Sequence, residues 1–373
     1  MRLLTGLILL TAFFFSCSKK ENVILIGEYG SLTGNTATFG QSTHQGIMLA
    51  TEEINQSGGI LGKPVKIITE DDQSKPEEAR NAVLKLIQQD KVVAVLGEVA
   101  SSRSLAGAPE CQRSRIPMIS PASTNPKVTE VGDYIFRICF IDPFQGESMA
   151  KFAYQNLNFR KIAVLTDIKN DYSVGLSQFF VNTFTSLGGT IIKKESYSEG
   201  DVDFRAQMTS LKAEKPEAIF LPGYYTEVGL ICRQARELGY QGPFLGGDGW
   251  DSDKTIEIGG TAVEGAYFSN HYSADVQDSK VRNFIEKFQS RYGKTADAMA
   301  VLGYDAAMIL FDAIRRAATT DGPVVRDALS QTKNFLGVSG TITLDEKRNA
   351  KKDLVVMKIE NGEFKYHQTV SPD

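Results

Sequence analysis

The chain contains little of the material from which metal and nucleotide sites are built. Its 373 residues include only three histidines, four cysteines and one tryptophan. Neither a CxxC nor an HExxH spacing occurs, which excludes the common zinc frameworks. We therefore expect neither a metal ion nor a cofactor.

Positive charge is neither abundant nor clustered. Lys and Arg number 41 against 45 Asp and Glu, for a formal net charge of −4. Because phosphate recognition needs clustered basic side chains, we expect no nucleic-acid partner. Hydrophobic residues make up 42% and charged residues 23%, a composition typical of globular proteins, and the length allows two or three domains.

Enzyme motifs are also missing. The segment Gly58–Lys63 has a P-loop-like spacing that is one residue short, and Pro64 stands where a magnesium-binding Ser or Thr belongs. Gly246–Gly249 departs from GxGxxG at its last position, and no GxSxG occurs. The histidines have no neighbouring Cys or Asp in the sequence: His44, His271 and His367. We therefore expect a protein that is not an enzyme.

Only one apolar run is long. Leu3–Phe15 follows Arg2 and is too short for a bilayer, which needs about 20 residues. It predicts a secretory signal. With Ser16-Cys17 it resembles a bacterial lipoprotein signal, which implies removal of residues 1–16 and a lipid on Cys17. An ordinary signal peptide with an incidental cysteine is the alternative. Either reading places the protein outside the cytoplasm.

Three cysteines remain in the rest of the chain, at 111, 139 and 232. An odd number allows at most one intramolecular disulfide, for which Cys111–Cys139 is an option. We favour three buried free thiols.

Short apolar runs alternate with amphipathic helical patterns, which predicts an α/β fold with parallel sheets covered on both faces. The expected strands are Val23–Gly27, Val65–Thr69, Val92–Gly97, Pro117–Ser120, Tyr134–Ile138, Lys161–Thr166, Thr190–Lys194, Ala218–Pro222, Pro243–Gly246, Gly265–Ser269, Gly340–Leu344 and Leu354–Ile359. The expected helices are Thr43–Asn55, Pro76–Gln89, Val174–Leu187, Phe204–Ala213, Tyr225–Leu238, Val281–Tyr292 and Ala298–Arg315.

Two loops follow expected strands at the edge where ligands bind in open parallel sheets. The first, Glu98–Ser104, brings Ser101 and Ser102 to a helix start, which suits either a carboxylate ligand or simple N-capping. The second, Ser120–Pro126, is stiffened by two prolines and carries Thr124, which suits either ligand contacts or a rigid turn.

An ordered set of motifs makes a family resemblance specific. These are Gly30–Gly34, Asn55–Ile60, Ser101-Ser102, Ile116–Pro126, Phe136–Gly146 and Gly223–Tyr225. Over nearly all of residues 22–370 the chain resembles the periplasmic leucine/isoleucine/valine-binding protein family, the type I solute receptors of branched-chain amino-acid ABC transporters.

The resemblance implies two Rossmann-like lobes joined by a three-segment hinge. The crossings are expected near Ile141–Phe144, Tyr272–Ala274 and Phe335–Val338. The first lobe would take residues 22–141 and 274–335, and the second residues 142–273 and 336–373.

The resemblance also implies a set of ligand contacts at the sheet edges. Ser101 would bind the ligand carboxylate, the Ala122 carbonyl would accept from the ammonium, and Thr124 would contact both. From the second lobe, Tyr172 would cover the ligand and Tyr224 would reach its carboxylate.

The expected ammonium partner is Asp248, where the best-known members carry Glu. Phe39, Tyr304 and Trp250 are further expected pocket residues. Read without the resemblance, the tyrosines suit core or surface positions and Asp248 suits a turn.

The main departure from the family pattern is Ala100, which replaces a disulfide-bonded cysteine. With Val99 it leaves a roomy wall, so a larger amino acid, an amide or a carboxylate is an alternative ligand. A carboxylate without an amine would leave Asp248 buried and unpaired.

We expect a receptor that captures a small amino acid, branched-chain or otherwise apolar, and delivers it to an ABC permease by lobe closure. A sensor of the same fold feeding a signalling partner is the second hypothesis, and an extracytoplasmic enzyme the third. The expected form is a monomer, periplasmic or on the cell surface, held on a bacterial membrane through the lipid anchor only.

Overall fold

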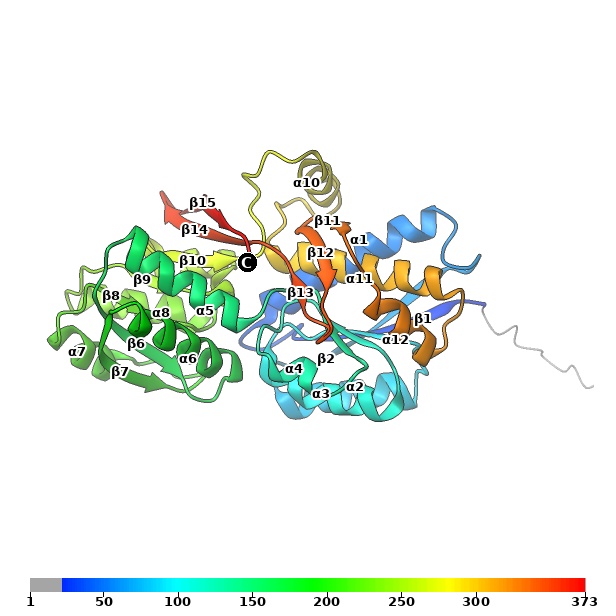
Figure 1. The fold of residues 1–373 in the computed structure, drawn as a ribbon, viewed down its shortest axis with the longest axis horizontal. Coiled ribbons are helices and arrows are strands. Elements are labelled where there is room, and N and C mark those ends of the chain that lie inside the picture. The colour runs from blue at the N-terminus through cyan, green and yellow to red at the C-terminus, as the bar shows by residue number, and fades with distance from the viewer. Residues whose placement is uncertain (1–21, 373) are drawn as a thin grey trace, which may run out of the picture.

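The computed structural model describes residues 22–372, and the signal segment with Cys17 lies outside them. Two halves lie side by side, each built around its own sheet (Figure 1). Within the described residues the first sheet has the order β2-β1-β3-β4-β5 and is parallel throughout. Its strands are β1 (Ile24–Gly30), β2 (Val65–Asp71), β3 (Val95–Leu96), β4 (Met118–Ser120) and β5 (Ile135–Arg137).

The second sheet has the order β15-β14-β10-β9-β8-β6-β7 among the described residues. Its parallel strands are β6 (Lys161–Asp167), β7 (Thr190–Tyr197), β8 (Ala218–Phe220), β9 (Phe244–Gly246) and β10 (Tyr267–Asn270). The C-terminal hairpin of β14 (Leu354–Glu360) and β15 (Glu363–Val370) adds to β10 in antiparallel direction.

Helices pack on the sheets of both halves (Figure 1). In chain order they are α1 (Ala37–Gln56), α2 (Pro76–Gln88), α3 (Ser101–Ser114), α4 (Lys127–Glu130), α5 (Asp142–Lys151), α6 (Asp171–Ser186), α7 (Arg205–Ala213), α8 (Tyr225–Glu237), α9 (Asp253–Gly259), α10 (Ser279–Tyr292), α11 (Ala298–Ala317) and α12 (Gly322–Ser330). Shorter helical turns are η1 (Phe152–Asn156), η2 (Asp248–Trp250) and η3 (Gly260–Val263).

The α/β prediction with parallel sheets is confirmed, and its errors are local. The strand expected over 92–97 shortens to β3, and strand β15 and helices α4, α5, α9 and α12 were not predicted. Helix α1 begins at Ala37, six residues before the predicted start at Thr43. The reason is Gly40, a poor helix former kept because a side chain there would collide with the Ser31 carbonyl.

Three cysteines of the described residues are buried free thiols: Cys111, Cys139 and Cys232. The preference for free thiols is confirmed, and the optional Cys111–Cys139 disulfide does not form. Between residues 22 and 372, no helix combines the length and hydrophobicity that crossing a bilayer requires.

Residues 335–351 form a small sheet of their own. We expected most of this segment to begin the C-terminal part of the second lobe. Strands β11 (Phe335–Gly337), β12 (Gly340–Leu344) and β13 (Ala350–Lys351) pair antiparallel. Arg348 in this segment accepts from the Arg137 backbone N–H at 3.2 Å, at the end of β5. The lobe boundaries stay predictions, but this attachment to the first half leads us to propose the third crossing at 352–353, where β14 follows.

Helices α1 and α11 touch backbone to backbone. A methyl group on Gly46 of α1 would collide with the carbonyl of Ala300, and one on Gly303 of α11 with the carbonyl of Thr43. Two glycines thus allow a close approach that no other residue permits. The contact matters because both helices reach the edge of the first sheet where ligands are expected.

We expect Gly46→Ala to lower the free energy of unfolding by about 1–3 kcal/mol, because the added methyl group overpacks the contact between α1 and α11. Urea denaturation measures this change. Gly30→Ala is the control, since its methyl group would lie 3.7 Å from Gly40 Cα, an ordinary contact. Equal losses in the two variants would contradict the close-contact explanation.

Candidate functional site

A cavity lies between the carboxyl ends of the two sheets, and seven of the ten predicted ligand residues line it. These are Phe39, Ser101, Ala122, Thr124, Tyr172, Tyr224 and Asp248, joined by Val99, Gly249 and Met299. Most follow directly on strands of one sheet or the other, as the strand-end argument predicts. The structure brings these residues together; their individual ligand roles stay predictions.

Three aromatic rings form the wall of the cavity and join the two halves. Tyr172 and Tyr224 stack with ring centroids 5.4 Å apart and an interplanar angle of 7°. Phe39, from the first half, packs edge-on against Tyr224 at 5.5 Å and Tyr225 at 4.9 Å. Such geometry is favourable for aromatic rings and excludes water from polar groups beside it.

Hydroxyl groups of the first half also line the cavity. Ser101 is the first residue of α3, where backbone N–H groups point outward, and its Oγ accepts from Asn125 N at 3.2 Å. Thr124 is 1% exposed, and its hydroxyl group lies beside the buried carboxyl group of Asp142.

The Asp248 carboxylate is held from both sides. Its Oδ1 accepts from Gln145 Nε2 at 2.6 Å, and its Oδ2 lies 2.9 Å from His271 Nε2. Burial lowers the pKa of His271, so the ring is neutral at pH 7 and has one N–H. An ionised carboxylate only accepts, which assigns that N–H to Nε2. The carboxylate therefore has a fixed orientation.

A second buried carboxyl group, Asp142, lies at the start of α5. Burial raises the pKa of this group to about 8, and the hydroxyl group of Thr124, which lies beside the carboxyl group, acts in the opposite direction. The nearby charge of Asp248 acts in the same direction as burial, and Arg137 opposes it. Asp142 is therefore mostly protonated at neutral pH, which avoids two buried negative charges in one place.

Hydrogen bonds cross between the halves around the cavity. Thr38 N donates to Tyr225 Oη at 3.2 Å, and Asn125 Nδ2 donates to the Asp171 carbonyl at 2.7 Å. The volume of the cavity is about 10 Å³, room for about one water molecule. A larger ligand therefore enters only when the halves, or the aromatic rings, move apart.

Three predicted pocket residues lie outside the cavity lining. Ala100 precedes α3 in extended backbone between Val99 and Ser101, so its side chain points away from theirs. Trp250 is buried in the second half, where Nε1 donates to the Leu221 carbonyl at 3.0 Å. Tyr304 donates instead to Glu53 at 2.9 Å.

Helix α11 contributes Met299 to the cavity lining, and not Tyr304 as we expected. Both residues are on α11, and five residues at about 100° each put them on different faces of the helix. Sequence reasoning did not select Met299 as a pocket residue. It also missed Gln145 and His271, because their contacts with Asp248 join residues 103 and 23 positions apart. Gln145 and His271 are polar residues at buried positions, and burial of a polar side chain was the one feature that could have pointed to them.

A family model described as periplasmic binding protein matches residues 23–363. The chain belongs to the periplasmic binding protein family. The resemblance seen in the sequence is confirmed, as is the type of fold.

Relatives and solved structures of this periplasmic binding protein agree. A Leu/Ile/Val-binding protein homologue of Brucella melitensis is 31% identical over 325 residues, 87% of each chain. A leucine binding protein from Thermotoga maritima is 44% identical, with a TM-score of 0.91 over 94% of this chain and 99% of that one. A branched-chain amino acid transporter substrate binding protein from Streptococcus pneumoniae, solved with isoleucine, is 31% identical, with a TM-score of 0.89 over 94% and 100%.

Asp142 gives this periplasmic binding protein a pH-dependent stability. The unfolded chain releases the Asp142 proton near pH 4, whereas the folded protein holds it to about pH 8. The folded state thus binds more protons across this window, and stability falls as pH rises from 4 to 8, by up to about 1.4 kcal/mol per pH unit.

We expect Asp142→Asn to reduce the slope of that fall by the share of one proton, measured by urea denaturation at several pH values, while other buried carboxyl groups such as Asp251 keep their contribution. Glu286→Gln, at an exposed position of α10, is the matched control and should keep the wild-type slope. An unchanged slope in Asp142→Asn would contradict the assignment of a proton to Asp142.

Proposed function

We propose that this protein is an extracytoplasmic receptor that captures a small apolar amino acid and presents it to an ABC permease. The observation that carries the proposal is the pairing of polar groups in one cavity. Asp248 supplies one buried carboxylate for an ammonium, and the start of α3 with Ser101 supplies N–H and hydroxyl donors for a carboxylate. A zwitterion needs both.

The identity of the remaining walls favours a branched-chain side chain. Phe39, Val99 and Met299 are apolar and contribute no charge to the cavity. The names of the relatives, which mention leucine, isoleucine and valine, support the same ligand class. A ligand with a carboxylate but no amine is disfavoured, because it would leave Asp248 without a cation.

Binding without chemistry is the simplest use of this site. The His271–Asp248 pair resembles part of a catalytic triad, but no nucleophile completes it: within residues 22–372, His271 Nδ1 has no hydrogen-bond partner. The family is one of binding proteins. We propose that the ligand is released unchanged, when the halves separate at the permease.

The Cys17 signal supports a periplasmic or cell-surface location on a lipid anchor. Several acyl chains at about 0.8 kcal/mol per buried methylene give stable attachment. The anchor would keep the receptor near its permease. We propose that it acts there as a monomer.

We expect Asp248→Asn to weaken isoleucine binding by about 2 kcal/mol or more, about 30-fold in Kd, because the ammonium loses its charged partner. Isothermal titration calorimetry on ligand-free protein gives the affinities. Tyr304→Phe is the control, since its ring lies outside the cavity lining, and it should bind as the wild type does. Wild-type protein that binds no leucine, isoleucine or valine would overturn the ligand class.

We expect Cys17→Ser to move the protein from the membrane fraction to the soluble extracytoplasmic fraction, because no residue is then left to carry lipid. Cell fractionation with immunoblotting measures the distribution. Cys232→Ser, a buried position of α8, serves as the control and should stay with the membrane. Membrane retention of Cys17→Ser would favour the alternative, an ordinary signal peptide with an incidental cysteine.

A further inference from the structure

One residue of the second half, Asp171, makes hydrogen bonds to two loops of the first half. Its backbone N–H donates to Ser102 Oγ at 2.9 Å, and the Ser102 hydroxyl donates in return to Asp171 Oδ2 at 2.9 Å. The Asp171 carbonyl accepts from Asn125 Nδ2 at 2.7 Å. Three hydrogen bonds that cross between the halves thus converge on one residue. We call the pair Ser102 and Asp171 the clasp.

The clasp lies directly beside residues that line the cavity. Ser102 follows Ser101 at the start of α3, and Asp171 precedes Tyr172 at the start of α6. Ser101 and Tyr172 line the cavity from different halves. Each clasp residue is therefore joined by one peptide bond to a residue that we expect to touch the ligand. When the clasp separates, Ser101 and Tyr172 move apart with it.

The Asp171 carboxylate lies where the N-termini of two helices meet. Ser102 is the second residue of α3, and Asp171 is the first residue of α6. Each helix N-terminus carries a partial positive charge, so two N-termini that approach one another repel. A carboxylate between them offsets this repulsion. When the halves separate, Asp171 stays with α6, and α3 loses the anion beside its N-terminus.

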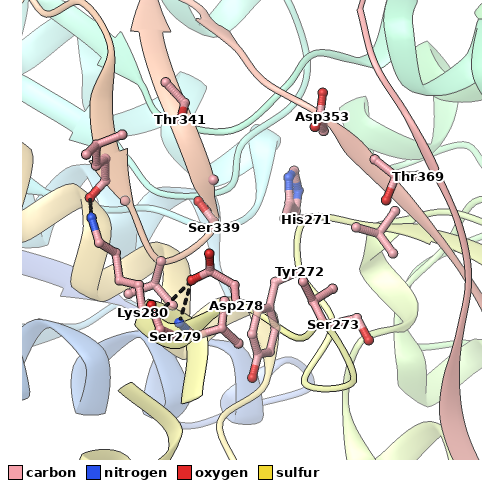
Figure 2. A pocket seen from close by; sticks show the side chains of 17 residues that line it. His271, Tyr272, Ser273, Asp278, Ser279, Lys280, Ser339, Thr341, Asp353 and Thr369 are labelled. Atoms are coloured by element: carbon pink, nitrogen blue, oxygen red, sulfur yellow. Dashed lines mark hydrogen bonds between the residues drawn. The ribbon is translucent and has the colours of Figure 1, made fainter. Parts of the chain in front are cut away.

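Capping of its own helix does not explain the position of the Asp171 side chain. Asn170 caps α6, because its side chain accepts from two N–H groups of the first turn. Asp278 gives the contrast at the start of α10, where it lines a pocket of about 370 Å³ beside the connection from β10. Its carboxylate accepts from Lys280 N at 2.7 Å, within its own helix (Figure 2). An aspartate at a helix start commonly caps in this way, whereas the Asp171 side chain reaches the other half.

We infer that Asp171 is a positioning residue of the proposed receptor: the clasp sets how long the closed cavity persists, and so how fast the amino acid is released. The release of an amino acid rests on the proposed function, whereas the closure of the halves does not. Asp171 lies outside the cavity lining of the described residues, so it acts through Ser102 and Tyr172. Because affinity differences among variants of one interface arise mainly in dissociation, clasp variants change release more than association.

The test follows opening and closing with two fluorescent dyes, one on each half. Lys66→Cys in β2 and Lys194→Cys in β7 provide exposed attachment positions, and the native cysteines at 111, 139 and 232 are buried. The chain is produced from Ser18 onward, which leaves out Cys17. Single-molecule energy transfer between the dyes gives the lifetime of the closed state, with and without isoleucine.

We expect Asp171→Ala and Ser102→Ala each to shorten the closed-state lifetime about tenfold, the effect of losing a hydrogen bond to a charged group. The double variant should match Ser102→Ala alone, because both changes remove the same contact. A double variant that shows the product of the two single effects would contradict a direct contact between the two side chains.

Asp278→Ala is the matched control, because it removes an aspartate whose hydrogen bond stays within one helix. It should lower the urea midpoint and leave the closed-state lifetime as in the wild type. Equal shortening in Asp278→Ala, or unchanged lifetimes in both clasp variants, would overturn the inference. If isoleucine does not lengthen the wild-type lifetime but both clasp variants shorten it, the proposed ligand is wrong and the clasp stands.

Discussion

The arrangement of the site depends on two hydrogen bonds to the Asp248 carboxylate, one from Gln145 and one from His271. Gln145 comes from the first turns of α5, and His271 from the residue after β10. Both lie next to the first two segments expected to cross between the lobes. The buried acid is thus tied to the parts of the chain that must rotate if the halves separate. Under the proposed function, the same two hydrogen bonds would join the ammonium-binding carboxylate to the segments that we expect to form the hinge.

The same region shows how the protein accommodates acidic groups in its interior. Asp251 of the second half accepts from Ala298 N of α11 at 2.6 Å, and burial together with the charge of Asp297 raises the pKa of Asp251 to about 8. Like Asp142, it is neutral in the closed arrangement. Burying a carboxyl group costs little free energy only while the group is protonated and therefore neutral. An opening that admits water to them would release protons.

Much of the fold followed from the sequence, because nearly all-apolar strands separated by amphipathic helices allow few architectures. The loops that carry Ser101 and Thr124 also followed, since loops after parallel strands meet at one edge, whereas the other cavity residues were expected only from the family resemblance. Tyr304 and Trp250 do not line the cavity, because a residue near a motif on a helix or a turn can face the core instead. The contacts of His271 were inaccessible to sequence reasoning, because pairing across the fold leaves no local pattern.

The glycine contact between α1 and α11 has a consequence for ligand selection. Gly46 and Gly303 allow the two helices to pack closely, and these helices carry Phe39 and Met299 into the cavity lining. In the proposed receptor, Phe39 and Met299 would contact the ligand side chain, and the flexible thioether of Met299 would accommodate differences in its branching. Evolution could therefore retune selectivity through one side chain at position 299 without rebuilding the frame that holds it.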